Sequence, residues 1–417
     1  MQVSLKYALS DAQVDATQPN SQRQVAFSIS AVPEALGRTV PLNLCLVLDQ
    51  SGSMEGKSLS TVKQAAQRLI DGLSPGDRIS IVTFNHKATV LLPNQIVDDP
   101  ATLKRSLQRL EASGGTAIDE GLRLGIEEIA KGKKDAISQL FLLTDGENEH
   151  GSNDRCLKLA QVATGYNLTL NSLGFGSSWN QDILEKIADA GGGTLSYIQQ
   201  PEQAMAEFGR LFSRVQAVGL TNAFLTLTVA PGVRLAEMKP LAQVAPDTIE
   251  LLIQQDGNQA IARLGDLMMD VPRVILANLY VNQLPEGKTA IAHAQLRYDD
   301  PTSGQEGLVS ESFPVEVAAS ALYQPMIDAE VQQHILALAK YRQTQIAEMK
   351  LQQGDRAGAA TMLQTAANTA LQMGDQGGAT VLQINATRLQ SGEVLSEADR
   401  KKTRLVSKTI LQPEESE

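Results

Sequence analysis

The fold is decided by the stretch Leu44-Cys45-Leu46-Val47-Leu48-Asp49-Gln50-Ser51-Gly52-Ser53-Met54, which joins a continuous apolar run to a loop of oxygen-bearing side chains. An unbroken apolar run of this length is typical of a strand buried on both faces of a parallel sheet. One carboxylate and two hydroxyls follow it at alternating positions, and hard oxygen ligands of this kind suit a small divalent cation. The stretch therefore predicts a buried strand that ends at a candidate metal site.

Two later segments carry matching groups. Gly114-Gly115-Thr116 precedes a helical pattern, and Leu142-Leu143-Thr144-Asp145-Gly146 ends a second apolar run. The combined pattern D-x-S-x-S, then Thr, then Asp resembles the metal-ion-dependent adhesion site of von Willebrand factor A domains, over about residues 41–212. The resemblance implies a magnesium ion, with manganese or calcium as alternatives, and one coordination position left for a partner's carboxylate. The implied ligands are Asp49, Ser51, Ser53, Thr116 and Asp145.

Each element of the pattern also has a purely structural interpretation. Ser51-Gly52-Ser53 fits a turn with a helix cap, and Thr116 with Asp119 fits a capping box at a helix start. Asp145-Gly146 is a common turn pair at a strand end. Three segments in the right order, each at the carboxyl side of a predicted strand, favour the metal site over three separate turns.

The region around these segments alternates short apolar strands with amphipathic helices, which is typical of a doubly wound α/β domain with a parallel sheet. The predicted strands are 42–48, 78–84, 140–143, 168–175 and 195–198, with an antiparallel edge strand at 88–92. The predicted helices are 58–72, 101–111, 118–130, 155–163, 181–190 and 201–214. Ligands of such sheets bind at the carboxyl ends of the strands, where Asp49 and Asp145 lie.

Residues 221–317 change to a period of two, which indicates an antiparallel β-sandwich. Strands are expected near 225–229, 249–253, 273–281, 290–298 and 308–317. The first 31 residues alternate in the same way, but two strands alone do not form a stable sheet. We therefore expect them to pair with the later strands, so that the α/β domain is an insertion in the sandwich.

Residues 327–390 are expected to be helical. Leu351-Gln352-Gln353-Gly354-Asp355 recurs as Leu371-Gln372-Met373-Gly374-Asp375, and each Gly-Asp pair is suited to end one helix and cap the next. The polar tail from Ser391 is expected to be partly disordered. The predicted boundaries are 1–39 and 217–318 for the sandwich, 40–216 for the α/β domain, 319–392 for the helices and 393–417 for the tail.

Composition narrows the class of protein. The chain of 417 residues has a net charge of −11 and a pI of about 5.0, which argues against nucleic-acid partners and anionic lipid surfaces. We see no signal peptide or membrane span, and Cys45 and Cys156 are expected to be buried free thiols, so a cytoplasmic protein is expected.

The leading functional hypothesis is a non-catalytic protein-binding module whose metal captures an Asp or Glu carboxylate of a partner. The first rival is a regulatory or adaptor subunit of an AAA+ ATPase of the chelatase or MoxR type, since intracellular bacterial A-domain proteins resemble partners of such engines. The second is a metal-dependent hydrolase. No G-x-S-x-G turn frames the serines, and the four histidines lack zinc-ligand spacing, although His150 follows Asp145 by five residues.

Overall fold

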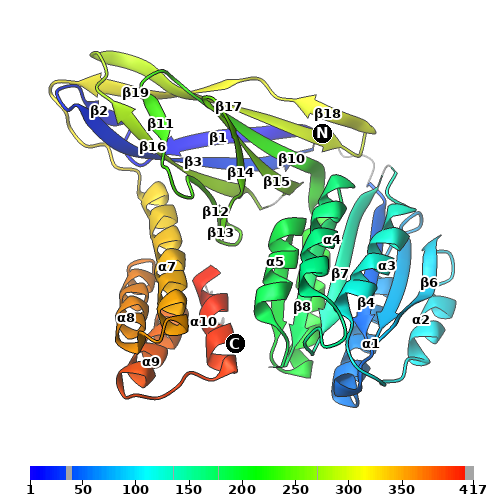
Figure 1. Ribbon diagram of the computed structural model, residues 1–417. Coiled ribbons are helices and arrows are strands. Elements are labelled where there is room, and N and C mark those ends of the chain that lie inside the picture. Colours follow the sequence, from blue (N-terminus) through cyan, green and yellow to red (C-terminus); the bar gives the residue numbers. More distant parts are fainter. Residues whose placement is uncertain (34–39, 135, 177, 270, 409–417) are drawn as a thin grey trace, which may run out of the picture.

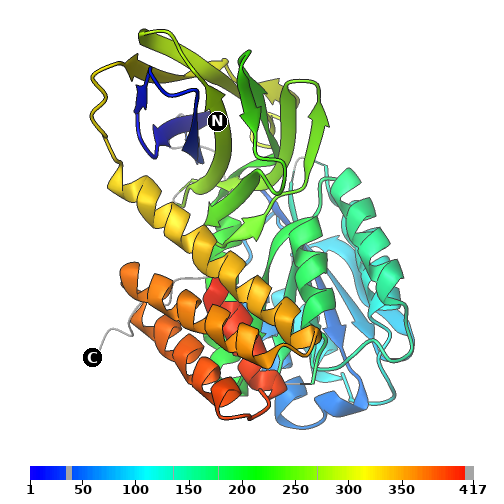
Figure 2. The ribbon, with the colours of Figure 1, turned by 60° about the vertical axis from the view of Figure 1, so that its left-hand side comes forward.

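The computed structural model describes residues 1–33, 40–134, 136–176, 178–269 and 271–408. They form an α/β domain, a β-sandwich and a helical arm, arranged so that the sandwich lies across one end of the other two parts (Figures 1 and 2). Among these residues, no helix is both long and apolar enough to span a membrane.

The α/β domain is built on a six-stranded sheet of order β6-β5-β4-β7-β8-β9, parallel except for the edge strand β6. The strands are β4 (Leu42–Asp49), β5 (Arg78–Phe84), β6 (Ala88–Ile96), β7 (Ile137–Thr144), β8 (Thr169–Phe175) and β9 (Gly192–Ile198). The predicted doubly wound sheet with an antiparallel edge is confirmed.

Helices cover both faces of this sheet, because alternate residues of the buried strands point to opposite sides. Leu44, Leu46 and Leu48 pack under α1 (Lys57–Asp71), α2 (Pro100–Gln108) and α6 (Ala204–Gln216). Cys45 and Val47 pack under the other three helices. Those are α3 (Ile118–Ala130), α4 (Asn153–Gly165) and α5 (Gln181–Gly191). Both cysteines are buried free thiols, as expected.

The sandwich consists of two sheets around one apolar core, antiparallel except for one parallel pair of strands in the second sheet. The first has the order β1-β3-β16-β12-β13, with β11 also paired to β16, and the second has the order β14-β15-β10-β17-β19-β2, with β18 paired to β17. Strands from the N-terminus pair with late strands in both sheets: β3 pairs with β16, and β2 pairs with β19. The α/β domain is therefore inserted in a discontinuous sandwich, as the sequence predicted.

The strands of the sandwich depart from the prediction both in their bounds and in their number. The expected strand 249–253 is two strands in different sheets, and 308–317 spans two strands. The strands at Gln13–Asp15, Val233–Leu235, Leu241–Ala245 and Gln259–Met268 were not predicted. The strands are β1 (Gln2–Leu9), β2 (Gln13–Asp15), β3 (Asn20–Val32), β10 (Val218–Val229), β11 (Val233–Leu235), β12 (Leu241–Ala245), β13 (Ile249–Glu250), β14 (Ile253–Asp256), β15 (Gln259–Met268), β16 (Arg273–Asn282), β17 (Gly287–Asp300), β18 (Gln305–Val309) and β19 (Phe313–Ser320).

The helical arm contains α7 (Ala329–Gln352), α8 (Arg356–Gln372) and α9 (Gln376–Gln390), joined by the two repeated turns. Gly354 and Gly374 have φ of 81° and 79°, in the left-handed region that glycine tolerates. Asp355 and Asp375 cap the next helices by accepting hydrogen bonds from Gly358 N and Gly378 N. The repeated turn works as predicted.

The expectation of a partly disordered tail from Ser391 is wrong for Glu397–Lys408, which forms helix α10 between the arm and the α/β domain (Figure 1). Its charged side chains have partners on both neighbours, so the composition that suggested a solvated tail is that of an interface helix. Residues 409–417 lie outside the described residues.

Candidate metal site

The carboxyl ends of β4 and β7 place the two predicted acids side by side. These strands are neighbours in the sheet and parallel, with Leu48 opposite Leu143. Asp49 is the last residue of β4, and Asp145 follows Thr144 at the end of β7. Because parallel strands end on the same edge, both acids lie on one rim of the α/β domain.

Asp49 is fixed by hydrogen bonds to both of its carboxylate oxygens. Oδ1 accepts from the backbone N–H of Ser51 at 2.7 Å, and Oδ2 accepts from the hydroxyl of Thr144 at 2.5 Å. The Asp49 side chain is fully buried. Sequence reasoning assigned no role to Thr144, although its place beside Asp145 at a strand end was a signal.

A chain of hydroxyl groups links the first loop to the second acid. Ser51 Oγ lies 3.0 Å from Ser53 Oγ, and Ser53 Oγ donates to Asp145 Oδ1 at 2.6 Å. Ser51 is the residue before a short 3₁₀ turn, Gly52–Met54, but its side chain makes no cap bond. The helix-cap interpretation of these serines therefore does not apply.

Thr116 lies near Ser53 and Asp145 and comes from a third loop, between α2 and α3. That loop is held against the first by hydrogen bonds from Gly52 N to Gly114 O at 2.9 Å and from Ser113 N to Gln50 O at 2.8 Å. A β-carbon placed on Gly146 would lie 3.3 Å from Thr116 Oγ1 and 3.8 Å from Ser53 Oγ. The hydroxyls of Thr116 and Ser53 thus both lie beside Gly146, next to Asp145.

The capping-box interpretation of Thr116 is wrong. The residue before α3 is Ala117, which makes no side-chain cap bond, and the N–H of Ile118 donates instead to Asn148 Oδ1 at 2.7 Å. Asp119 is buried and pairs with Arg155 at 3.1 Å. The Thr116 hydroxyl is therefore not needed for a helix cap.

The electrostatics of the rim favour a bound cation. Burial raises the pKa of Asp49 to about 6, the nearby Asp145 charge adds to this rise, and hydrogen bonds from Thr144 and Ser51 oppose it. Burial also raises the pKa of Asp145, against the bond from Ser53. Among the ion pairs of the described residues, none includes Asp49 or Asp145. Adjacent carboxylates, one buried and one half-buried, that lack a protein cation fit a divalent metal.

The side chains that could bind a cation at this rim are carboxylates and hydroxyls. Within the described ranges, no group of three or more His, Cys, Asp or Glu side chains is placed to hold a metal. A cation at this rim would be held by two carboxylates and three hydroxyls, which suits magnesium, manganese or calcium better than zinc.

Two histidines lie on the rim beside the third loop. The ring of His150 occupies the space next to Gly115, and the ring of His86 occupies the space next to Gly114. His150 N also donates to Thr116 O at 2.9 Å. The glycines leave room for these rings, and His150 helps to position the backbone of Thr116.

Comparisons with known families match two parts of the chain. Residues 43–209 match the model of the von Willebrand factor type A domain, and residues 329–413 match the model of the Sll0103-like C-terminal alpha-helical domain. The second match includes α10, which the sequence analysis had assigned to the tail.

Whole-chain relatives are found in both sequence and structure. The Synechocystis protein sll0103 is 58% identical over 413 residues, covering 99% of this chain and 98% of its own length. A von Willebrand factor type A protein from Catenulispora acidiphila shares 19% identity at a TM-score of 0.80, over 98% of this chain and 97% of that chain. The ArnB paralog VWA2 from Sulfolobus acidocaldarius shares 16% identity at a TM-score of 0.57, over 97% and 98%.

Proposed function

The chain belongs to the family of the Synechocystis protein sll0103 and carries a von Willebrand factor type A domain, so we propose that it is a binding module that captures a partner protein through a divalent cation on the rim. Domains of this type mediate protein–protein interactions, which supports the general class. The metal and the chemistry of the partner are our proposal.

The observation that carries the proposal is the convergence of three loops on one point. Ser51 and Ser53 come from the β4 loop, Thr116 from the loop before α3, and Asp145 from the end of β7, and their side chains are linked or adjacent through the contacts given above. Asp49 is held beneath them with both oxygens bonded. If each segment were only a local turn, there would be no reason for the three sets of side chains to lie together.

The proposed metal ligands differ in how deeply their side chains are buried. Asp49 and Ser51 are buried and supply a fixed base, whereas Ser53 is exposed at the surface of the rim. A divalent cation bound there would supply an electrophilic position open to an Asp or Glu carboxylate of the partner. Because its remaining protein ligands are neutral hydroxyls, the cation stays electrophilic enough to take that acid as a further ligand.

We propose binding and not catalysis at this rim. The hydroxyls of Ser51 and Ser53 bond to each other and to Asp145, so neither is paired with an imidazole base that would activate it as a nucleophile.

A peptide array tests the proposal. Each peptide is printed with its acidic residues and again with Asn or Gln in their place, and the full chain is applied with magnesium or with a chelator. We expect acid-dependent binding that requires magnesium, disappears in Asp145→Ala and persists in Asp154→Ala, an acid in the first turn of α4. Binding that ignores the chelator or the acid would overturn the proposal.

A further inference from the structure

Helix α10 contacts helix α5 of the α/β domain through regularly spaced charged residues, and we call this contact the seam. Its cations Lys401, Arg404 and Lys408 recur every three or four residues, so they share one face of the helix. On α5 the acids Asp182, Glu185 and Asp189 recur with the same spacing. Two helices with matching spacing can pair step by step along their length.

The cations of α10 form ion pairs with the acids of α5 in the same order along both helices. Arg404 forms ion pairs with Asp182 and, at 3.6 Å, with Glu185. Lys408 lies 2.6 Å from Glu185 and 3.2 Å from Asp189. Because residues later in α10 meet residues later in α5, the two helices run in the same direction.

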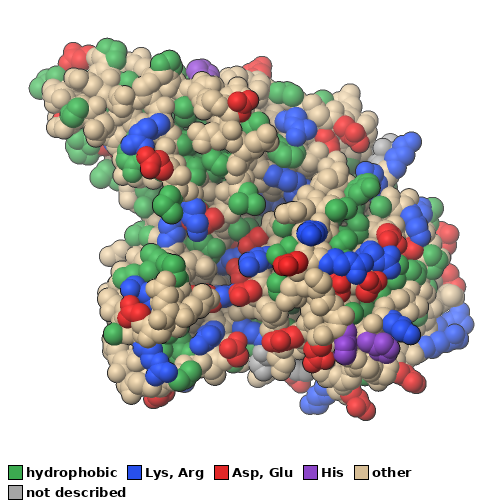
Figure 3. All heavy atoms as spheres, in the orientation of Figure 1, with side chains coloured by type: hydrophobic (Ala, Val, Ile, Leu, Met, Phe, Trp, Pro, Cys, Tyr) green, Lys and Arg blue, Asp and Glu red, His purple; other side chains and the backbone are tan. Residues whose placement is uncertain are grey.

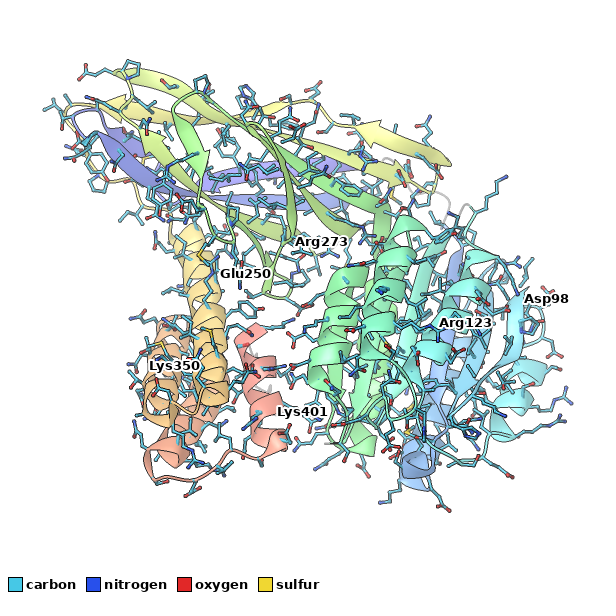
Figure 4. All side chains as sticks on the ribbon, viewed as in Figure 1. Asp98, Arg123, Glu250, Arg273, Lys350 and Lys401 are labelled. Atoms are coloured by element: carbon cyan, nitrogen blue, oxygen red, sulfur yellow. The ribbon has the colours of Figure 1, made fainter. Side chains whose placement is uncertain are left out.

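The first cation of the seam, Lys401, contacts an aromatic side chain. Lys401, labelled on α10 in Figure 4, donates to the backbone oxygen of Trp179 at 2.7 Å, and its Nζ lies 4.2 Å from the centre of the Trp179 ring. Trp179 is 2% exposed and follows β8, whose carboxyl end lies on the metal rim. The seam therefore begins beside the candidate site.

Helix α10 is joined to the arm by apolar packing on its opposite face and by an ion pair of Arg404 with Glu348 of α7. Val406, with Leu395 just before the helix, belongs to the apolar core that α8 and α9 build. Arg388 of α9 pairs with Asp399 of α10 at 2.7 Å. The arm in turn packs on the sandwich through an apolar cluster that contains Val331, Leu338 and Tyr341 of α7.

The seam is charged, and a cleft lies beside it. A cleft of about 330 Å³ separates α5 from α7, lined by residues that include Asp182, Glu348 and Arg404. Figure 3 shows blue and red side chains gathered along the boundary between the arm and the α/β domain. Polar interfaces inside a chain are the ones that open and close, whereas apolar cores stay shut.

We propose that the seam is a releasable clasp, in which the basic face of α10 holds the acidic face of α5 and, on release, uncovers that face together with Trp179. The arm and the sandwich stay together because their contact is apolar, and the α/β domain separates from the arm while its junction with the sandwich persists. The acidic face of α5 and Trp179 then form a surface for a basic helix, which α10 occupies in the closed state. This inference does not depend on a metal.

Trp179 is the one tryptophan of the chain, so its fluorescence reports directly on the clasp. The test variant is the full chain with Arg404→Gln and Lys408→Gln, and the matched control is Arg388→Gln, which removes an ion pair between α9 and α10 and leaves the contact with α5 intact. In the test variant we expect stronger quenching of Trp179 by acrylamide and hydrogen exchange in α5 faster by about tenfold or more, the factor that corresponds to ~1.4 kcal/mol. The control should match the wild type in both measurements.

A wild-type salt titration provides a second test that requires no substitution. Raising the salt from about 0.05 M to about 1 M shortens the screening length several-fold, so quenching of Trp179 should rise while the exchange of β4 stays slow. Unchanged Trp179 quenching in both the double variant and high salt would overturn the proposal. Faster exchange throughout β4–β9 in both tests would also overturn it, because that result would mean unfolding of the domain.

Discussion

The hydroxyl of Ser53 donates a 2.6 Å hydrogen bond to Oδ1 of Asp145, across 92 positions of the sequence. This bond joins the loop after β4 to the end of β7 at the surface of the rim. It also brings a hydroxyl and a carboxylate within the distance at which both could bind one cation. The two segments therefore act as one site, and changes in either should affect the same property.

Substitution of Gly146 by Ala should weaken metal binding without unfolding the domain. Its β-carbon would lie 3.3 Å from Thr116 Oγ1, which must then move away from the site. Loss or displacement of one neutral oxygen ligand should reduce affinity by about tenfold, or ~1.4 kcal/mol. Calorimetric titration with Mn²⁺ measures this, and Gly165→Ala, which meets no atom within 4 Å, is the matched control. Equal affinities in the two variants would contradict the placement of Thr116.

Asp49→Asn should stabilise the metal-free protein at neutral pH. The folded-state pKa of about 6 lies above the ordinary 3.8, so the folded chain binds the extra proton between these values, and stability is lost as the pH rises through this window. A shift of this size corresponds to about 3 kcal/mol of lost stability above pH 6, since one pKa unit is ~1.4 kcal/mol. Asparagine keeps the shape of the side chain and carries no charge.

Urea unfolding in the presence of a chelator measures that effect. The stability difference between Asp49→Asn and wild type should be largest at pH 7 and shrink toward pH 4. A variant that is less stable than wild type at pH 7 would show that burial does not penalise the Asp49 charge.

The two repeated helix caps should differ greatly in energetic importance. Asp375 is fully buried and also lies 2.7 Å from Nζ of the buried Lys340, whereas Asp355 is exposed and pairs with the surface residue Lys350. Asp375→Ala removes the carboxylate partner of a buried ammonium group, and breaking such a pair costs about 3–5 kcal/mol. Asp355→Ala loses a cap at the surface and should cost less. Urea unfolding of the two variants compares them directly, and similar losses would mean that the buried pair adds nothing to the cap.

The α/β domain and the two acids at its rim could be predicted because short stretches of sequence indicate them. Each buried strand is a continuous apolar run, and Asp49 and Asp145 are marked by their positions directly at strand ends. Thr116 follows helix α2 and not a strand, so its place beside them depends on the backbone hydrogen bonds that join its loop to the loop after β4. The role of Asn148 at the start of α3 depends on a contact across 30 positions, and no local pattern indicates it.

Strand β15 and helix α10 could not be predicted for a related reason. Strand β15 contains the buried Asp266, which accepts hydrogen bonds from Gln139 and Thr169 of the α/β domain, and these polar contacts interrupt the apolar alternation. Arg273, labelled in Figure 4, bonds to the backbone oxygen of Asp266 at the same junction. Helix α10 has partners about 220 positions earlier on α5, so its charges look solvated when the sequence is considered alone.

The central claim is that three separate loops hold one divalent cation, and calorimetric titration of Mg²⁺ and Mn²⁺ into the chelator-stripped full chain tests it most directly. The account predicts one saturable site in wild type and in Asp154→Ala, and loss of that site in each of Asp49→Ala, Thr116→Ala and Asp145→Ala, which each remove one ligand from a different loop. Saturable binding of equal strength in all five proteins would contradict it.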